Sequence, residues 1–516
     1  MTSTQTVDYE SRAGGFRTAF FGHPRGVYLI AAVEVWERFS FYGMRGLLVL
    51  FLVAPVAAGG FGWSAGEALT FYGSYIALAY ATPIVGGYIA DHFTGPRRAL
   101  IVGAILMSLG HFLMAGPVLF PWLLGVVSGQ PLLKYLQDQS ALPLGKLVLG
   151  SDELNLLQST LEDAPAAFES ISVNMLTLAY QSVGYSFYAA TGLIILGTGF
   201  FKPNSYALLG RLYADDHPQR ENGVFLFQIA VNLGAVFSGL IAGTVGEKFG
   251  WHLGFTVAGF GMLIGAVIFV SLQQRYVGSV PHTPPAKLYK TVSSEGTLTA
   301  TERRRLWVIA TMALFSALYW LAAEQYGGLI NLYAQQSTDR MVAGFEIPAT
   351  WFLSLNPFFI VTLTPLAMVL WSGVGRRVTP PGKFAYGFVM TAVGFLLMVL
   401  AFEEMAASTD QKSSALWLVG AYLFVTLGEL CILSIGTNMV NTYAPLRMIG
   451  SVLAFWFLCT ALGNYGSGLV GAMTESLPDG VIFAGIAVTC LLAAALLCIG
   501  TRWWSTLMHD NEIRTR

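Results

Sequence analysis

Residues 253–275, LGFTVAGFGMLIGAVIFVSLQQR, form an apolar run with no charged side chain before Arg275. A helix needs roughly 20 apolar residues to cross a hydrocarbon core about 30 Å thick, so this run is long enough to span a membrane. The next residues, 276–304, read YVGSVPHTPPAKLYKTVSSEGTLTATERR and are rich in proline, polar and basic residues. A second long apolar run begins at Leu306. The polar stretch between the two runs therefore marks a linker.

Similar apolar runs recur on both sides of this linker, along the whole chain. Only 11% of the residues are charged, whereas soluble domains have about 25%. A membrane β-barrel would require strands that alternate apolar and polar residues, and these runs are apolar throughout. The pattern predicts an all-α membrane protein with twelve transmembrane helices, at residues 25–53, 66–90, 98–124, 182–209, 222–246, 253–275, 306–334, 349–372, 383–402, 415–441, 449–473 and 480–503.

The linker divides these helices into two groups of six. We expect an N-terminal six-helix bundle at 25–275, a linker at 276–305 and a C-terminal six-helix bundle at 306–503, with tails at 1–24 and 504–516. Two such halves with a site between them are typical of the major facilitator architecture. The loop GYIADHFTGPRR at 87–98 resembles a signature of that superfamily. An insertion at about 125–181 caps the site or is merely tolerated, and its composition leaves both alternatives open.

The basic residues indicate how the chain is oriented. Most of its 28 lysines and arginines fall in the tails and in the loops that follow even-numbered spans, and such residues are retained on the cytoplasmic side. We therefore expect a multi-pass protein of the cell (inner) membrane with both termini in the cytoplasm. The chain starts with the polar segment MTSTQTVDYE, which is unlike a cleavable signal peptide. A net charge of -1 argues against binding nucleic acid.

The sequence predicts neither a metal site nor a cofactor. The four cysteines Cys431, Cys459, Cys490 and Cys498 lie in the last three predicted spans, and we interpret them as small packing residues. No nucleophile stands beside a base at the spacing of a known catalytic motif. We therefore do not expect an enzyme.

Several charged residues fall inside the predicted spans. Glu34, Glu37, Arg38, Tyr42 and Arg45 share one stripe of the first predicted helix. An ionisable group at the bilayer centre costs about 2.5 kcal/mol or more, so it is retained only where it is paired, hydrated or useful. Further charges lie in other spans: Lys202, Glu324 and Glu429. One such pair would suit a structural role, but opposite charges spread over four helices favour a functional site.

The residues of the first span also resemble a family signature. The string Glu34-x-x-Glu37-Arg38-Phe39 is similar to the Glu-x-x-Glu-Arg-Phe motif of the proton-dependent oligopeptide transporter family. A second resemblance runs from GTGFFKPN at 197–204 to Asn232. Shorter matches occur around Trp320, Asn356, Glu429 and Trp456, so the resemblance covers nearly all predicted spans.

This resemblance implies how a peptide is bound. Members of the family hold the carboxylate of the peptide with the residues that correspond to Arg38, Arg45 and Lys202. They hold its amino end with the counterparts of Glu429, Asn232 and Asn356, while aromatic residues matching Tyr42, Tyr80 and Trp456 shape the side-chain pockets. A peptide has two oppositely charged ends and side chains that vary. Its binding site therefore needs a cationic pole, an anionic pole and, between them, pockets that accept different side chains. The family often has tyrosine where this chain has Gln228, so we expect a more polar pocket there.

Coupling to protons requires a carboxylate that takes up a proton when a neighbouring cation moves away. We expect Glu34 or Glu37 beside Lys202 to do this, and Glu324 matches the second protonation position of the family. The predicted function is a proton-coupled symporter, monomeric and embedded in the lipid bilayer, that takes up di- and tripeptides by alternating access. A proton-coupled carrier of another small anion or peptide-like compound is the alternative. A membrane-bound sensor or enzyme would need a further domain or a catalytic constellation.

Overall fold

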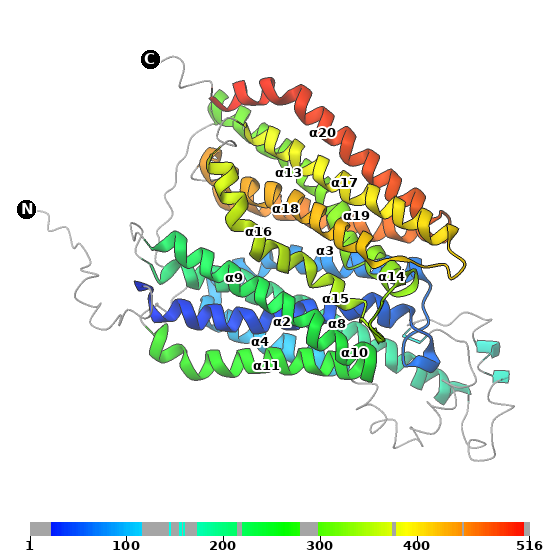
Figure 1. Ribbon diagram of the computed structural model, residues 1–516. Coiled ribbons are helices and arrows are strands. Elements are labelled where there is room, and N and C mark those ends of the chain that lie inside the picture. Colours follow the sequence, from blue (N-terminus) through cyan, green and yellow to red (C-terminus); the bar gives the residue numbers. More distant parts are fainter. Residues whose placement is uncertain are drawn as a thin grey trace, which may run out of the picture.

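The computed structural model describes residues 22–115, 144–145, 154–156, 158–159, 173–213, 219–278, 298–373, 378–445 and 448–509. Most of the predicted insertion at 125–181, and residues 116–124 of the third predicted span, lie outside these ranges. The described part of the chain is almost entirely helical (Figure 1).

The first half of the chain contributes the helices α2 (Arg25–Val53), α3 (Ala65–Ile89), α4 (Pro96–Met114), α8 (Val173–Arg211), α9 (Arg220–Ser238), α10 (Thr244–Phe249) and α11 (Trp251–Tyr276). Three short helical pieces adjoin them: the 3-10 helix η2 (Val56–Ala58) and the π-helices η3 (Ala90–Thr94) and η6 (Gly239–Gly243). The π-helix η3 continues α3, so α3 and η3 together form one span. The π-helix η6 joins α9 to α10, so these three elements also form one span.

The second half contributes α13 (Ala300–Ala323), α14 (Leu329–Gln336), α15 (Thr350–Leu353), α16 (Leu355–Ser372), α17 (Pro380–Ala407), α18 (Ala415–Tyr443), α19 (Ile449–Ala472) and α20 (Asp479–His509). The 3-10 helices η7 (Glu324–Tyr326) and η10 (Met473–Glu475) follow α13 and α19. Two small sheets complete the fold. Strand β1 (Thr338–Asp339) pairs in parallel with β4 (Ser413–Ser414), and β2 (Met341–Val342) pairs antiparallel with β3 (Phe345–Glu346).

Helix α13 starts at Ala300 rather than at the predicted residue 306. Thr299 Oγ1 accepts a hydrogen bond from the Glu302 amide (3.1 Å), and Glu302 Oε2 accepts one from the Thr299 amide (2.8 Å). This reciprocal cap satisfies amide groups that the first turn of a helix leaves unpaired. The polar residues before Leu306 therefore form a helical turn, although their composition suggested a linker.

The structure confirms the prediction of an all-α membrane protein. Within the described part of the chain, eleven helices are long and apolar enough to cross a membrane. Helix α2 has 29 residues and is a twelfth helix of sufficient length, although it carries Glu34, Glu37, Arg38 and Arg45. Because α2 is buried along most of its length, these charges face protein rather than lipid.

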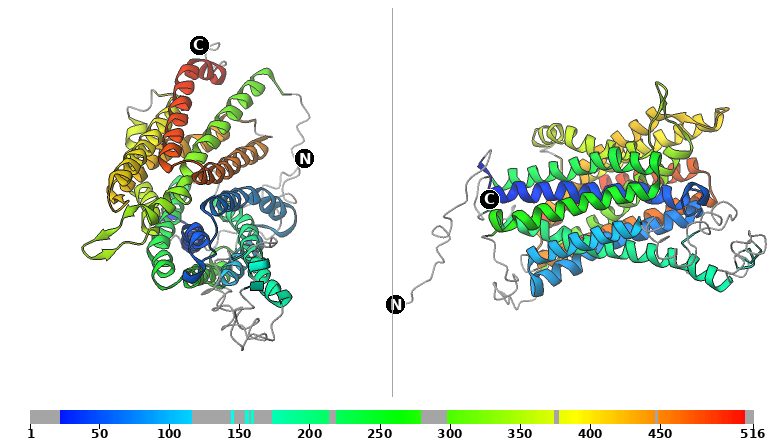
Figure 2. Two further views of the ribbon diagram at one scale, coloured as in Figure 1. Left: turned by 90° about the vertical axis from the view of Figure 1, so that its right-hand side faces the viewer. Right: turned by 90° about the horizontal axis from the view of Figure 1, so that it is seen from below.

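The helices form two groups that approach each other at one end of the molecule and diverge at the other (Figure 1). Helix α2 begins and α20 ends at the divergent end, which we call the terminal end. The opposite end, where α10, α14 and α15 lie, we call the closed end. Viewed from the closed end, the helices are seen nearly end-on and the β2–β3 hairpin projects sideways (Figure 2, left).

A close approach of α3 and α19 brings the two halves together near the closed end. A Cβ atom on Gly73 would lie 2.6 Å from Gly468 Cα, and one on Gly468 would lie 2.5 Å from the Leu69 carbonyl oxygen. These two glycines thus allow backbone-to-backbone contact between the bundles, as small residues do in membrane helices generally.

Candidate functional site

The first part of the site is a buried charge cluster within α2. Arg38 contacts both neighbouring glutamates: Nη2 lies 2.8 Å from Glu34 Oε1, and Nε lies 2.9 Å from Glu37 Oε2. Both glutamates are fully buried, and Arg38 is 6% exposed. One guanidinium therefore balances two carboxylates, and the cluster retains one excess negative charge when all three groups are ionised.

Lys202 of α8 lies near this cluster but does not form the ion pair that we predicted with Glu34 or Glu37. Its Nζ atom stands 4.3 Å from the ring centroid of Phe41 and 4.4 Å from that of Tyr80. Among the described residues, no carboxylate lies within ion-pair distance of Lys202. The reason is local, because Arg38 lies on the same helix as the two glutamates and already contacts both of them. Lys202 still interacts electrostatically with Glu37 and Glu34 over a longer distance.

Arg45 connects α2 to the C-terminal half of the chain. Its Nη2 atom lies 2.9 Å from Glu324 Oε1, and its Nε atom donates a 2.7 Å hydrogen bond to the Tyr72 hydroxyl. Tyr72 in turn donates a 2.7 Å hydrogen bond to Glu324 Oε1. Glu324 is the first residue of η7, directly after the end of α13. The two predicted arginines thus have different partners, and in this conformation Arg45 is engaged across the bundle interface.

A second pole lies on the opposite side of the interface. Glu429 of α18 accepts a 2.7 Å hydrogen bond at Oε2 from Asn356 Nδ2 of α16, and the same amide group lies 3.0 Å from Thr426 Oγ1. The structure therefore brings Glu429 and Asn356 together as predicted. No cationic side chain of the described residues pairs with Glu429, which is 8% exposed. This carboxylate can accept an ammonium group from a ligand.

Aromatic rings surround the cations between the poles. The guanidinium of Arg45 lies 5.3 Å from the centroid of Tyr42, and Tyr80 is 6.4 Å from Trp320. Tyr42 interacts electrostatically with Arg38 and Arg45 and also with Glu324 and Glu429 of the other half, so it lies between the poles. Rings placed beside cations attract them and tolerate varied apolar neighbours.

Three other predicted residues make contacts that do not link the poles. Asn232 Nδ2 donates a 2.9 Å hydrogen bond to the Gln228 carbonyl, within α9, and exposed Gln228 lies 3.4 Å from the Tyr206 hydroxyl. Trp456 of α19 is 5% exposed and packs against Gly436, where a Cβ atom would lie 2.3 Å from its ring. Asn232 and Gln228 therefore stay on the N-terminal side of the interface.

The closed end carries polar contacts that we did not predict. Glu247 of α10 accepts hydrogen bonds from the amides of Ala349 and Thr350, both 2.9 Å long, and from Thr350 Oγ1 at 2.7 Å. Arg340 Nη1 lies 3.7 Å from its Oε2 atom. A glutamate near the end of an apolar run gives no signal of a partner in the other half of the chain. The same holds for Tyr72, a tyrosine within an apolar run.

The chain resembles known transporters in sequence and in overall fold. The sequence profile described as "POT family" matches residues 97–293 and 286–483. The chain is 29% identical to the peptide transporter YePEPT of Yersinia enterocolitica, over 94% of this chain and 95% of that protein. It is 25% identical to the di-/tripeptide transporter of Lactococcus lactis subsp. cremoris, over 95% and 98% of the two chains. A crystal structure of a mutant peptide transporter POT in complex with alafosfalin has a TM-score of 0.77 and 26% identity, covering 96% of this chain and 98% of that one.

Proposed function

The chain belongs to the POT family of transporters, and from this premise we propose that it takes up di- and tripeptides together with protons by alternating access. The observation that carries the proposal is the pair of opposite poles on facing bundles. Arg38, Arg45 and Lys202 supply the cations of one pole, which become available to a peptide carboxylate when the glutamates beside them take up protons. Glu429 with Asn356 supplies the anionic pole. A free dipeptide carries a carboxylate and an ammonium group, which match the two poles in charge.

The terminal end faces the cytoplasm in this proposal. Lysines and arginines concentrate in the loops of that end, which is the side on which such residues are retained. The bundles diverge at the terminal end and meet at the closed end (Figure 1), which corresponds to an inward-facing conformation. Both termini would then lie in the cytoplasm, and the protein would sit in the inner membrane as a multi-pass monomer.

Proton coupling would act through carboxylates that share cations with the substrate. Arg45 is bound to Glu324 here and must leave it before it can bind the carboxylate of a peptide. A proton on Glu324 removes the charge that attracts the guanidinium, so protonation and peptide binding favour each other. Glu37, held by Arg38 and lying near Lys202, offers a second carboxylate of this kind.

Uptake by purified protein in proteoliposomes tests the proposal. An inward-directed proton gradient should drive accumulation of a labelled dipeptide, and unlabelled di- and tripeptides should compete with it. A dipeptide blocked by N-acetylation and C-terminal amidation is the matched control, because it keeps the side chains but lacks both charges. Uptake no greater than in empty liposomes, or equal competition by the blocked peptide, would contradict the proposal. Competition by simple organic anions instead would favour a carrier of another small anion.

A further inference from the structure

The hydroxyl of Tyr72 occupies a position between the two charged partners that join the bundles. It accepts a hydrogen bond from Arg45 Nε and donates one to Glu324 Oε1, and both distances are 2.7 Å. Arg45 Nη2 contacts the same oxygen, Oε1, at 2.9 Å. The three side chains thus form a closed ring of contacts, and Tyr72 is fully buried.

This arrangement fixes the guanidinium more firmly than the ion pair alone. The shortest contact between Arg45 and Glu324 joins Nη2 to Oε1 at 2.9 Å. The hydrogen bond that Nε donates to the Tyr72 hydroxyl is a further point of attachment, on another nitrogen of the guanidinium.

The backbone makes room for this ring of contacts at a glycine. A Cβ atom on Gly327 would lie 1.8 Å from the Tyr72 hydroxyl and 2.9 Å from Arg45 Nε. Gly327 follows η7, where the helix that carries Glu324 is interrupted. Only a residue without a side chain at this position allows Tyr72 and Arg45 to approach Glu324 together.

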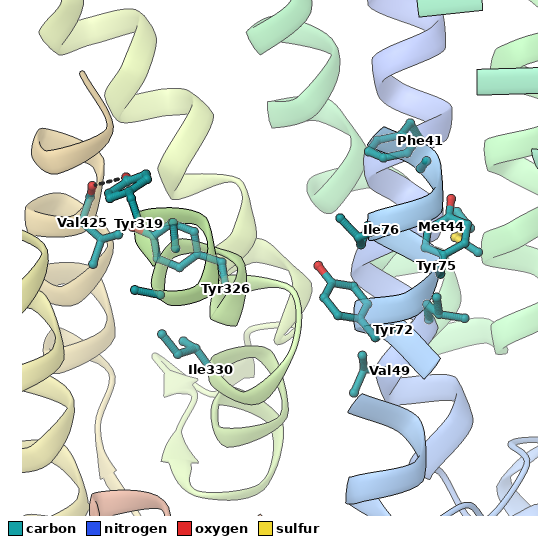
Figure 3. Packing of buried hydrophobic residues seen from close by; sticks show 14 of the residues in the cluster. Phe41, Met44, Val49, Tyr72, Tyr75, Ile76, Tyr319, Tyr326, Ile330 and Val425 are labelled. Atoms are coloured by element: carbon teal, nitrogen blue, oxygen red, sulfur yellow. Dashed lines mark hydrogen bonds between the residues drawn. The ribbon is translucent and has the colours of Figure 1, made fainter. Parts of the chain in front are cut away.

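A neighbouring tyrosine on the same helix provides an internal comparison. Figure 3 shows the Tyr72 hydroxyl directed toward the helices that carry Tyr319 and Tyr326. The ring of Tyr75 instead stacks on that of Phe41, with the centroids 6.5 Å apart. Tyr75 is also buried, at 2% exposed, but its hydroxyl has no hydrogen-bond partner among the described residues. Two buried tyrosines of α3 therefore differ in whether they touch the Arg45–Glu324 pair.

We propose that Tyr72 is a positioning residue that links the release of Arg45 to the protonation of Glu324. While Glu324 is ionised, the Tyr72 proton points to Oε1 and the hydroxyl oxygen holds Nε. When Glu324 takes up a proton, its oxygen no longer attracts both donors, and the hydroxyl can rotate and release the guanidinium. This inference rests on the proposed function, because the released arginine is the one that binds the carboxylate of the peptide.

Other groups also act on Glu324, but at longer range. Beyond Arg45 and Tyr72, the titratable or charged groups that interact electrostatically with it are Lys202 of α8, Tyr42 of α2, Tyr80 of α3 and Glu429 of α18. Within the described part of the chain, Tyr72 is the one uncharged side chain that hydrogen-bonds to Glu324. Removal of the Tyr72 hydroxyl should therefore affect the coupling of protons to peptide without removing a charge from the site.

The test compares Tyr72→Phe with Tyr75→Phe in the same proteoliposome preparation. We expect Tyr72→Phe to lower gradient-driven accumulation of a dipeptide about tenfold, as loss of a hydrogen bond to a charged group would. Exchange of labelled for unlabelled peptide needs no net proton movement and should stay within about twofold of the wild type. Tyr75→Phe should leave both activities unchanged. Equal losses of accumulation and exchange in Tyr72→Phe, or identical behaviour of the two variants, would overturn the proposal.

Two further measurements guard against a simple folding defect. Gly327→Ala removes no hydrogen-bonding group but displaces the Tyr72 hydroxyl, so it should give the same selective loss of accumulation. A double-mutant cycle of melting temperature should show that Tyr72→Phe and Glu324→Gln are less than additive; additive effects would contradict the ring of contacts. Wild-type protein that accumulates no peptide would refute the proposed function, whereas an active wild type matched by Tyr72→Phe would refute only this inference.

Discussion

The two ends of the interface between the bundles are built differently. At the closed end, Glu247 accepts three hydrogen bonds from Ala349 and Thr350, and Asn331 Nδ2 donates a 2.9 Å hydrogen bond to the Gly46 carbonyl. Toward the terminal end the bundles diverge (Figure 1). The inter-bundle hydrogen bonds and ion pairs of the described residues concentrate in the half of the molecule that contains the closed end.

This difference shows that polar groups contribute to closure of this end, and such groups can be exchanged for water or for other partners. A buried apolar seam would have to expose its surface to water at about 25 cal/mol per Å² on opening. A carboxylate that leaves its donors can be hydrated instead, so polar closure is reversible at smaller cost. Such an interface suits a protein that must open alternately at both ends.

Glu247→Ala should have the largest effect, because it removes the acceptor for Thr350 and leaves Arg340 without this carboxylate. Breaking a buried charge pair costs about 3 to 5 kcal/mol. We expect the equilibrium to shift toward conformations open at the closed end. Distances between spin labels on α10 and the β2–β3 hairpin should become longer or broader. An unchanged distance distribution would mean that apolar packing alone keeps this end closed.

Glu37→Gln and Lys202→Gln come next and address the centre of the interface. Replacing a coupling group should abolish gradient-driven accumulation, a loss of several kcal/mol of driving force, while exchange of labelled peptide persists. Glu37 is also an ion-pair partner of Arg38, so a purely structural role predicts lower melting temperature and parallel loss of both activities. Lys202 contacts aromatic rings and no carboxylate of the described residues, so we expect its variant to lose less thermal stability than Glu37→Gln. Normal accumulation in both variants would exclude these residues from coupling.

Glu429→Gln should have a smaller effect that depends on the substrate. The glutamine can still accept the hydrogen bond from Asn356, but it no longer attracts an ammonium group. We expect affinity for free dipeptides to fall about tenfold, a change of about 1.4 kcal/mol, and affinity for N-acetylated dipeptides to change little. Competition assays with matched pairs of peptides measure the difference. Equal losses for both members of a pair would assign Glu429 a structural role.

Glu346 should show the smallest effect, since its side chain is 46% exposed. The hydrogen bond from Lys248 and the charge of Arg340 hold the pKa of Glu346 below its usual value. Its contribution is therefore present above the unfolded-state pKa, about 4.3, and is lost as the pH falls through the lower folded-state value. Because exposed pairs contribute about 0 to 1 kcal/mol, Glu346→Gln should lower the melting temperature only slightly at pH 7, and progressively less as the pH falls through the folded-state pKa of Glu346. A difference that does not shrink on acidification would point to packing of the β2–β3 hairpin instead.

The sequence by itself determined the class of the protein and much of the charged stripe of α2. Apolar runs of sufficient length specify membrane helices, because in lipid only a helix or a closed barrel satisfies the backbone. The helical period places Glu34, Arg38 and Arg45 on one stripe. Glu34 and Arg38 are four residues apart, a spacing at which side chains on a helix can touch, so their contact could be predicted. The start of α13 was missed, although the capping pattern of Thr299 and Glu302 is visible in the sequence.

Only the tertiary structure decided which groups meet across helices. A helical period fixes the direction of a side chain around its own axis, but its partner depends on how far two helices approach and at what angle. Lys202 therefore lies against Phe41 and Tyr80, because Arg38 already occupies the glutamates of α2. The contacts of Tyr72 and Glu247 depend likewise on close packing of the two bundles, which glycines at the interface make possible. Gly327 makes the room for Tyr72, and a Cβ atom on Gly243 would lie 2.1 Å from the hydroxyl of Thr350.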